Sequence, residues 1–561
     1  MKFTTESQAV LNVLASVLSL VQLDGYFAKI DGMRLALYVC MLFPVATYLA
    51  NEVLIYTAQH KSLAFSRNTP HRIELLTTRS RHNLKRVLEN QSSSLAAAYE
   101  EYRHRYGIKP PPGFQKWYEM ASLAQSLLID EYDSINHSVS PFLQYSGKQI
   151  HDMILHTYNQ RGADLWLCRF SKVTSNTTCQ HPFRSFDRHI SLLFNTILAN
   201  VTGLADVQFL VNHIDEPRVL LPKPQQASSH YTSITIKDCS RKPVWDLLTQ
   251  NCEVDIDTTA DLEGVQSFGL PFVSNISSSQ DLCRHPEYSQ WHGLVTSPVS
   301  FRPINGPVPV FSTGALSTMG DILIPSPAYI EQEFLYDETK DIEWEKKRRN
   351  LYWAGSTTGG FTNKANWRLL HRQRFVEISQ NLKRQNYYLW GKGDKVKRAM
   401  SSFLNGRLFH VSFTRIFQCS PQACRNQDAY FGTEGWADKD EALKSTLAFD
   451  IDGNGISGRY YKLLASKSVP LKQTLLREWH DDRLVPWLHY VPISQSMEEL
   501  PELVFYLTST DSGMEISRQI AESSREWYSR AFRQVDLGIY TYRLLLEMAR
   551  LQDHERAAGK D

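Results

Sequence analysis

A glycine-rich turn follows an apolar run in the stretch AFDIDGNGISGRYYKLLASKS, residues 448–468. Gly453, Gly455 and Gly458 form the turn, and a helical pattern begins near Arg459. Small residues let backbone N–H groups approach an anion, and a helix N-terminus adds positive potential. Arg459 could then pair with a diphosphate through two parallel hydrogen bonds. The pattern predicts either a phosphate site or a tight turn whose glycines serve only its conformation.

Two aspartates, Asp450 and Asp452, close the same apolar run. Such a pair can hold a divalent ion on a nucleotide diphosphate in one class of sugar transferases. The glycine turn follows at once here, and the order of the chain differs from that class. We therefore expect one aspartate to cap the turn, and we predict no metal at this pair.

A second small-residue turn lies in LYWAGSTTGG, residues 351–360. Backbone amides and the hydroxyls of Ser356, Thr357 and Thr358 can surround an anion or a sugar. The segment that follows has helical spacing and carries Arg368, Arg372 and Arg374. Arg368 and Arg372 are four residues apart and would share one helix face. The alternative is that this face is simply basic and solvated.

A third candidate is HIDEPRV, residues 213–219, where a strand-like run meets Pro217. Asp215 and Glu216 lie at this strand end beside His213. A carboxylate in a cleft could take a proton from an acceptor hydroxyl. The alternative is an exposed acidic loop in which Arg218 pairs with its neighbours.

The elements that must position these residues change in character along the chain. Residues 115–200 have a mostly helical pattern, and short strands are predicted at DVQFLVN, HYTSITI and VPVFSTG. After the charged run at residues 333–349, strands alternate with helices: NLYWAGS, NYYLWG, STLAFDIDG, SVPLKQ and LHYVPIS. This alternation predicts a mostly parallel sheet with helices on both faces. The fold class is therefore α/β.

Composition and length narrow the class of protein. The chain has 561 residues, of which 42% are hydrophobic and 21% charged, which is typical of a globular protein larger than one domain. The formal net charge is +2 without a long basic run, so nothing indicates nucleic-acid binding.

An uncharged run, LALYVCMLFPVATYLAN at about residues 35–51, predicts a membrane anchor near the N-terminus. Its length is near the lower limit for a spanning helix, and a buried core helix is the alternative. The flanking basic residues are balanced, so they leave the orientation open.

Cysteine usage favours an oxidising compartment. Cys168 with Cys179, and Cys419 with Cys424, are close enough in sequence to close short disulfide loops. Seven cysteines lie outside the apolar run, so at least one thiol should stay free. Five N-glycosylation triplets begin at positions 90, 136, 176, 200 and 275, and they support a secretory route weakly.

Five stretches in this order together resemble one family: YRHRYGIKPPPGFQKWYEMA, VNHIDEPRV, PVFSTGALSTMGDILIPSPAY, LYWAGSTTGG with HRQRF, and FDIDGNGISGRYYKLLASKSVPLKQTLLREWHDDRLVPWLHYVPIS. They resemble the fungal capsule-associated glycosyltransferases of glycosyltransferase family 90, to which the protein O-glucosyltransferases of the endoplasmic reticulum also belong. The resemblance covers about residues 95–550.

The resemblance implies a GT-B fold, in which two Rossmann-like domains face each other across a cleft. The expected organisation is an N-terminal segment with the anchor (1–60), a stem and helical lead-in (61–130), an acceptor-side domain (131–345), a nucleotide-sugar domain (346–535) and a C-terminal helix (536–561). The implied reaction is inverting and metal-independent, with no cofactor. It moves a sugar, xylose or glucose, from a UDP-sugar to a hydroxyl of a glycan or glycoprotein in the lumen of the Golgi or endoplasmic reticulum.

The family pattern N-x-x-D-x-P falls on residues 212–217, so the resemblance implies that Asp215 is the catalytic base, with Glu216 as the second choice. The implied donor-binding residues are Gly355, Ser356, Thr357, Arg372, Gly453, Asn454, Ser457 and Arg459. Many members have an arginine where this chain has Ala354. One of the three helix arginines could supply the missing charge; otherwise the protein would be a weak enzyme, an enzyme that uses its donor differently, or a catalytically silent sugar-binding paralogue.

Overall fold

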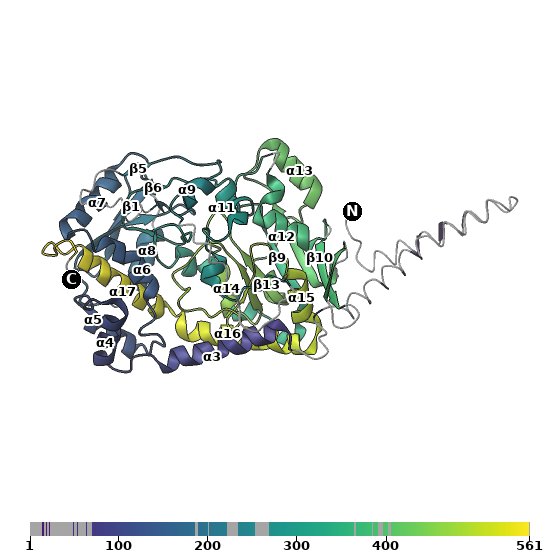
Figure 1. Ribbon diagram of the computed structural model, residues 1–561, viewed down its shortest axis with the longest axis horizontal. Helices are drawn as coiled ribbons and strands as arrows, with labels where there is room; N and C mark the ends of the chain where they lie inside the picture. Colours follow the sequence, from purple (N-terminus) through teal and green to yellow (C-terminus); the bar gives the residue numbers. More distant parts are fainter. Residues whose placement is uncertain are drawn as a thin grey trace.

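The computed structural model describes residues 70–185, 189–199, 201–220, 234–252, 269–363, 366–383, 385–390, 396–401 and 406–559, with scattered single positions before residue 70. Two five-stranded sheets dominate this part of the chain, and helices surround both (Figure 1). The fold is α/β, as the alternating pattern predicts.

The C-terminal sheet is parallel throughout its described pairings. Its order is β12 (Phe409–Arg415), β9 (Arg348–Ser356), β13 (Ser445–Ile451), β14 (Val469–Gln473) and β15 (Val491–Pro492). Every residue of β13 and β14 is buried, as expected for central strands covered on both faces. Parallel strands align their carboxyl ends at one edge, which brings the turns after β9 and β13 together.

One predicted strand of this sheet is placed wrongly by the sequence pattern. NYYLWG forms β10 (Gln385–Trp390), whose partner among the described strands is β11 (Val396–Ser401), in a separate antiparallel ribbon. The edge position in the parallel sheet belongs to β12 instead. Periodicity assigns a strand but not its partner, so an alternating pattern cannot distinguish the two.

The N-terminal sheet is mixed. Its order is β2 (Thr177–Gln180), β1 (Leu165–Phe170), β3 (Val207–Asn212), β7 (Val310–Ser312) and β8 (Ile322–Leu323). β1 runs antiparallel to both of its neighbours, whereas β3, β7 and β8 are parallel. The prediction that residues 115–200 are mostly helical is therefore wrong for β1 and β2, because a short apolar run such as LWLCRF does not reveal whether it is strand or buried helix. A small sheet joins β4 (Val219–Leu220), β6 (Ile304–Asn305) and β5 (Thr235–Ile236).

The helices divide between the two sheets. The longer ones are α3 (Arg72–Glu89), α4 (Leu95–Tyr106), α5 (Phe114–Leu123), α6 (Asp133–Val139), α7 (Gly147–Asn159), α8 (His189–Ile197), α12 (His371–Ser379), α13 (Pro421–Phe431), α15 (Leu500–Ser509), α16 (Asp511–Ala531) and α17 (Gln534–Leu551). The short ones are α9 (Trp245–Thr249), α10 (Ile276–Ser279), α11 (Gly293–Thr296) and α14 (Tyr460–Ala465).

The C-terminal helix packs on the N-terminal sheet, and the first described helix packs on C-terminal elements. α17 packs among α5, α8 and β3 and adds its apolar face to the core of the N-terminal sheet (Figure 1). α3 instead lies beside the C-terminal elements, where His71 stacks on Tyr506 with 3.9 Å between ring centroids. Tyr506 also donates a hydrogen bond to Glu74 over 2.7 Å. The segment expected to be a stem is thus packed into the body of the protein from α3 onward.

Three disulfides join Cys168 to Cys179, Cys252 to Cys283, and Cys419 to Cys424. The two close pairs are the ones that the sequence predicts, and among the cysteines that the structure describes Cys239 is the free thiol. The predicted anchor at residues 35–51 lies outside the described residues, apart from two single positions. None of the helices in the described ranges is long and apolar enough to span a bilayer.

Candidate active site

The turns after β9 and β13 lie side by side at the carboxyl edge of the C-terminal sheet. β13 ends at Ile451, the glycine turn follows, and α14 begins at Tyr460 with Arg459 as its N-cap residue. The sequence places these boundaries correctly. α14 has only six residues, so its dipole is small, and a bound anion would depend on backbone amides and arginine side chains more than on the helix.

Arg372 ties the two turns together from behind. Its guanidinium donates to the carbonyls of Asp452 (2.7 Å) and Ile451 (3.1 Å) on one side. On the other side it donates to the Ser356 carbonyl (3.0 Å) and the Thr358 hydroxyl (2.6 Å). The structure therefore gives this predicted donor-binding residue a bridging position between the two turns.

Arg459 approaches the same edge from α14 and donates to the carbonyl of Ala354 over 3.0 Å. A guanidinium thus lies against the backbone of β9 at Ala354, the position where the resemblance leads us to expect an arginine. Burial, and then the neighbouring Arg459 charge, lower the pKa of Arg372 to about 9. Burial also lowers the pKa of Arg459. Two guanidiniums held this close make the edge of the sheet a favourable place for an anion.

The other predicted donor-side residues have mixed surroundings. Gly355 is buried within β9, and Ser356 has its hydroxyl 3.2 Å from that of Thr358. The Thr357 hydroxyl is engaged by the backbone of Phe417, donating to its carbonyl and accepting from its N–H, both over 2.9 Å. Ser457 is buried in the glycine turn beside Asp450. Burial raises the pKa of the Asp450 carboxyl, and the hydrogen bond from the Ser457 hydroxyl acts in the opposite direction.

The two remaining helix arginines point elsewhere. Arg374 donates to the carbonyls of Gln495 and Ser496 and lies over the Trp291 ring. Arg368 lies over Trp367 and Tyr430. Of the arginines singled out in the sequence, Arg372 and Arg459 are therefore the two that contact the turns after β9 and β13.

The loop after β3 carries Asp215 from the opposite side. The Asn212 amide donates to the carbonyls of Ile214 and Glu216, which folds the loop back on the strand end. The Glu216 carboxylate is fully buried and accepts from the backbone N–H (2.9 Å) and hydroxyl (3.1 Å) of Ser300. Asp215 is exposed and lines a pocket. Of the two candidate bases, only Asp215 is placed to meet a substrate.

Asn454 joins this loop to both turns. Its amide nitrogen donates to Asp215 Oδ2 over 3.4 Å, and its oxygen accepts from the N–H of Gly359 over 3.1 Å. Gly455 lies so close to the Asp215 backbone that a Cβ there would be 2.3 Å from the Asp215 carbonyl oxygen. All three candidate segments of the sequence therefore meet at one point.

The pKa of the Asp215 carboxyl lies above its ordinary value. The side chain is open to solvent but sits in a concave site where protein atoms replace much of the surrounding water, and this raises its pKa. The hydrogen bond from Asn454 acts in the opposite direction. A raised pKa brings the carboxylate closer to the pH at which a general base works best.

A pocket of about 330 Å³ opens beside Asp215. Residues from both halves of the fold line it, among them Ile456 and Gly458 of the glycine turn and Ile324, which follows β8. His189 and Glu331, which also line it, form an ion pair of 3.0 Å. The pocket has room for a small polar group or a single sugar ring with an apolar face.

The two aspartates of the DxD pair are engaged separately. Asp450 pairs with Lys472 at 3.2 Å, and the Asp452 carboxylate accepts from the N–H of Leu475 at 2.8 Å. Each of the two carboxylates thus has a partner of its own within the protein. Among the described residues, the group with metal-ligand spacing is Asp164, His181 and His213, whose ligand atoms lie within 4.8 Å of one another. Arg184 and Arg302 contact the same Asp164 carboxylate, at 3.4 and 3.7 Å, and a cation would have to displace them.

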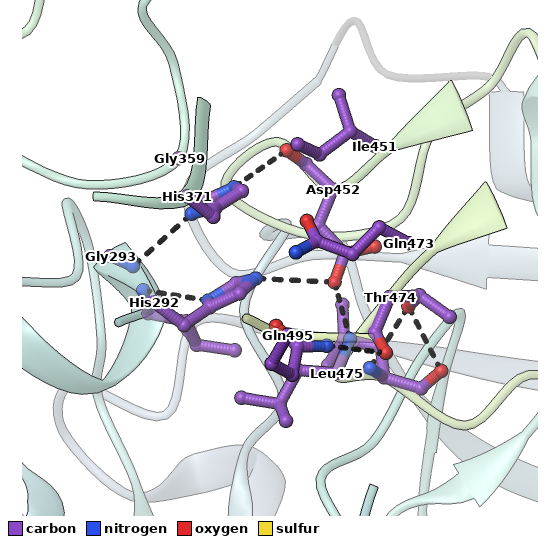
Figure 2. A network of polar contacts seen from close by, with 12 residues as sticks. His292, Gly293, Gly359, His371, Ile451, Asp452, Gln473, Thr474, Leu475 and Gln495 are labelled. Atoms are coloured by element: carbon purple, nitrogen blue, oxygen red, sulfur yellow. Dashed lines mark hydrogen bonds and ion pairs between the residues drawn. The ribbon is translucent and has the colours of Figure 1, made fainter. Parts of the chain in front are cut away.

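Two contacts of this site have no signal in the sequence. One is the link from Asn454 to Asp215, which joins residues 239 positions apart. The other is His292, which reaches Asp452 from a segment between the predicted motifs (Figure 2). A lone histidine in a Pro- and Ser-rich region has nothing in its sequence context to distinguish it.

Comparison with known proteins points to one family. Residues 327–560 match the family model described as Glycosyl transferase family 90. The O-glucosyltransferase rumi of Drosophila pseudoobscura pseudoobscura is 31% identical over 83 residues, which are 14% of this chain and 20% of that protein. The aligned part is thus a fifth of the relative's length. The capsule-associated branch of the family stays a prediction from the sequence.

Proposed function

We propose, from the match of residues 327–560 to the model of glycosyl transferase family 90, that the chain is a glycosyltransferase. It transfers a sugar, xylose or glucose, from a UDP-sugar to a hydroxyl of a glycan or glycoprotein. The observation that carries the proposal is the meeting of Asp215 with both donor-side turns through Asn454. This contact supports the proposal because it joins a solvent-accessible carboxylate to the two turns that we propose to bind the donor.

Asp215 acts as the general base in this proposal. It takes the proton of the acceptor hydroxyl, whose oxygen attacks the anomeric carbon while the bond from that carbon to the diphosphate oxygen breaks. Attack from the face opposite the diphosphate inverts the configuration. The acceptor approaches through the pocket of about 330 Å³ beside Asp215.

The leaving diphosphate is stabilised without a metal in this proposal. Arg459 is the direct partner, because its guanidinium lies at the edge of β9 and carries donors beyond the one given to Ala354. Arg372 adds charge from behind while it holds the two turns. Backbone N–H groups of the glycine turn complete the set. Preorganised donors of this kind commonly supply the largest part of transition-state stabilisation.

We also propose a GT-B arrangement and a lumenal location. Two α/β units, each built on one five-stranded sheet and joined at the candidate site, support the first. Three disulfides support passage through an oxidising compartment, such as the endoplasmic reticulum or Golgi. The anchor at residues 35–51 would attach the protein to that membrane.

The test is sugar release and transfer by the purified chain. UDP-xylose and UDP-glucose are supplied with water or a simple glycoside as acceptor, and free UDP is measured. Wild type should release UDP from one of them, and Asp215→Asn should reduce the rate by at least about 100-fold, the usual contribution of a general base. Glu216→Gln controls for loop damage, since Glu216 is buried and is not among the residues that line the pocket.

Two results would contradict the proposal. Full activity in Asp215→Asn would show that Asp215 is not the general base. UDP binding without turnover of any UDP-sugar would favour the sugar-binding paralogue that Ala354 suggests, although Arg459 beside Ala354 supports an active enzyme.

A further inference from the structure

Two buried histidines stack face to face behind the glycine turn. The rings of His292 and His371 lie 3.8 Å apart and within 3° of parallel (Figure 2). His371 is the first residue of α12 and is fully buried, whereas His292 precedes α11 and is 1% exposed. The two side chains come from segments 79 positions apart in sequence, and His292 lies outside the part of the chain that matches family 90.

Hydrogen bonds fix which nitrogen of each ring carries the proton. Nδ1 of His292 accepts from the N–H of Leu294 over 3.2 Å, and Nδ1 of His371 accepts from the N–H of Gly293 over 3.3 Å. A histidine ring that accepts a hydrogen bond at Nδ1 has its N–H donor at Nε2. Burial, and then His292 and Arg372, keep the pKa of His371 well below its ordinary value, so this ring is neutral.

Both Nε2 atoms face one residue, Asp452. Nε2 of His371 donates to its carbonyl over 2.8 Å, and Nε2 of His292 lies 3.3 Å from its carboxylate (Figure 2). The N–H of Leu475 also donates to this carboxylate over 2.8 Å. Asp452 immediately precedes Gly453 and Asn454, so its position sets where Asn454 meets Asp215.

The same segment also supports the turn after β9. A Cβ on Gly293 would lie 1.5 Å from the carbonyl oxygen of Gly359, so the two backbones touch. The N–H of Phe361 donates to the Ser297 carbonyl over 2.7 Å. Segment 292–297 thus contacts both donor-side turns at once.

We propose that His292 is a positioning residue of the donor site: together with His371 it holds the glycine turn and the turn after β9 in the arrangement that binds the diphosphate of a UDP-sugar. The inference rests on the proposed function for its ligand. The inference gives His292 a part in donor binding, although this residue precedes residues 327–560, which match the family model.

The experiment measures loop order and UDP binding separately in the full chain. His292→Ala should speed amide hydrogen exchange in residues 356–361 and 451–455, measured without ligand, and should weaken the affinity for UDP about tenfold, the size expected for losing one buried contact to a charged group. His292→Gln keeps an N–H near the Nε2 position and should recover part of both effects. This conservative variant keeps the test valid if His292→Ala fails to fold.

His489→Gln is the matched control. His489 is 1% exposed, stacks on Trp527 at 4.8 Å and accepts from the N–H of Val485, but it contacts neither donor-side turn. Its substitution should lower thermal stability without raising exchange in the two loops or weakening UDP. Equal exchange in wild type and His292→Ala, or equal UDP affinity, would overturn the inference. A wild type that binds no UDP would instead overturn the proposed function, and the ligand-free exchange data separate these two failures.

Discussion

Replacing Asn454 by aspartate is the most direct test of the contact between Asn454 and Asp215 and of the role of Asp215 as the base. Asn454 donates to Asp215 over 3.4 Å and accepts from Gly359, and an aspartate has nearly the same shape. The variant keeps the acceptor for Gly359 but puts a second negative charge beside Asp215. Like charges disfavour ionisation, so the pKa of Asp215 must rise further.

The magnitude follows from Coulomb's law. Two unit charges about 4 Å apart repel by about 1 kcal/mol in water and about 4 kcal/mol in the partly screened surroundings of a protein surface. Because Asp215 is exposed, the lower part of this range applies. About 1 to 2 kcal/mol corresponds to a pKa roughly one unit higher.

The assay is the pH dependence of kcat/KM for UDP-sugar turnover. Activity requires the ionised carboxylate, so its acid limb should move to higher pH by about one unit in Asn454→Asp. Asn454→Ala removes the hydrogen bond without adding charge, and its shift should be smaller and in the same direction. Added salt should reduce the shift only in the aspartate variant. An acid limb at the same pH in all three proteins would refute the assignment of Asp215 as the base.

Three further predictions concern other parts of the fold. Arg372→Lys should lower the free energy of unfolding, measured with denaturant, by about 3 kcal/mol or more. The reason is that an ammonium group cannot replace the four hydrogen bonds of the guanidinium. An unchanged denaturation midpoint would contradict the bridging role of Arg372. Burial raises the pKa of Glu499 to about 7 from 4.5, so the folded state retains a proton that the unfolded chain has lost. Stability should therefore fall as pH rises from about 4.5 to 7, by up to about 3 kcal/mol relative to Glu499→Gln, and parallel stability curves for the two proteins would refute this. Expressed through a secretory route, the chain should carry an N-glycan at Asn176, exposed before β2, and Asn176→Gln should remove one enzymatically releasable glycan; identical masses would argue against lumenal folding.

Helices, strands and short loops were predictable where the residue pattern also contains residues that mark their ends. β13, the glycine turn and the start of α14 near Arg459 follow from an apolar run, three closely spaced glycines and a helical repeat. The disulfide partners at 168/179 and 419/424 follow from loop length. The resemblance, rather than any local pattern, selects Asp215 over Glu216, and the burial of Glu216 against Ser300 gives that choice a physical reason.

Contacts between distant segments were not predictable in the same way. Asn454 carries no mark of its partner Asp215, and His292 carries none of its stacking on His371. β1 and β2 were missed because their partners, and not their own residues, decide between strand and helix. Arg372 was expected to face a ligand, but a buried guanidinium with five donors also suits the joining of two loops, and its sequence context cannot distinguish these uses.

The position of α17 has a practical consequence for the choice of fragment boundaries in expression. The family match begins at residue 327 and includes α17, yet the apolar face of this helix is part of the core beneath the N-terminal sheet. Trp117, for example, donates to the Ile539 carbonyl over 3.0 Å. A fragment expressed from residue 327 onward would leave that face uncovered and should aggregate. The recognisable module and the smallest autonomous folding unit are therefore different lengths of chain, and a shortened version intended for crystals or screening should keep the polypeptide from α3 through α17.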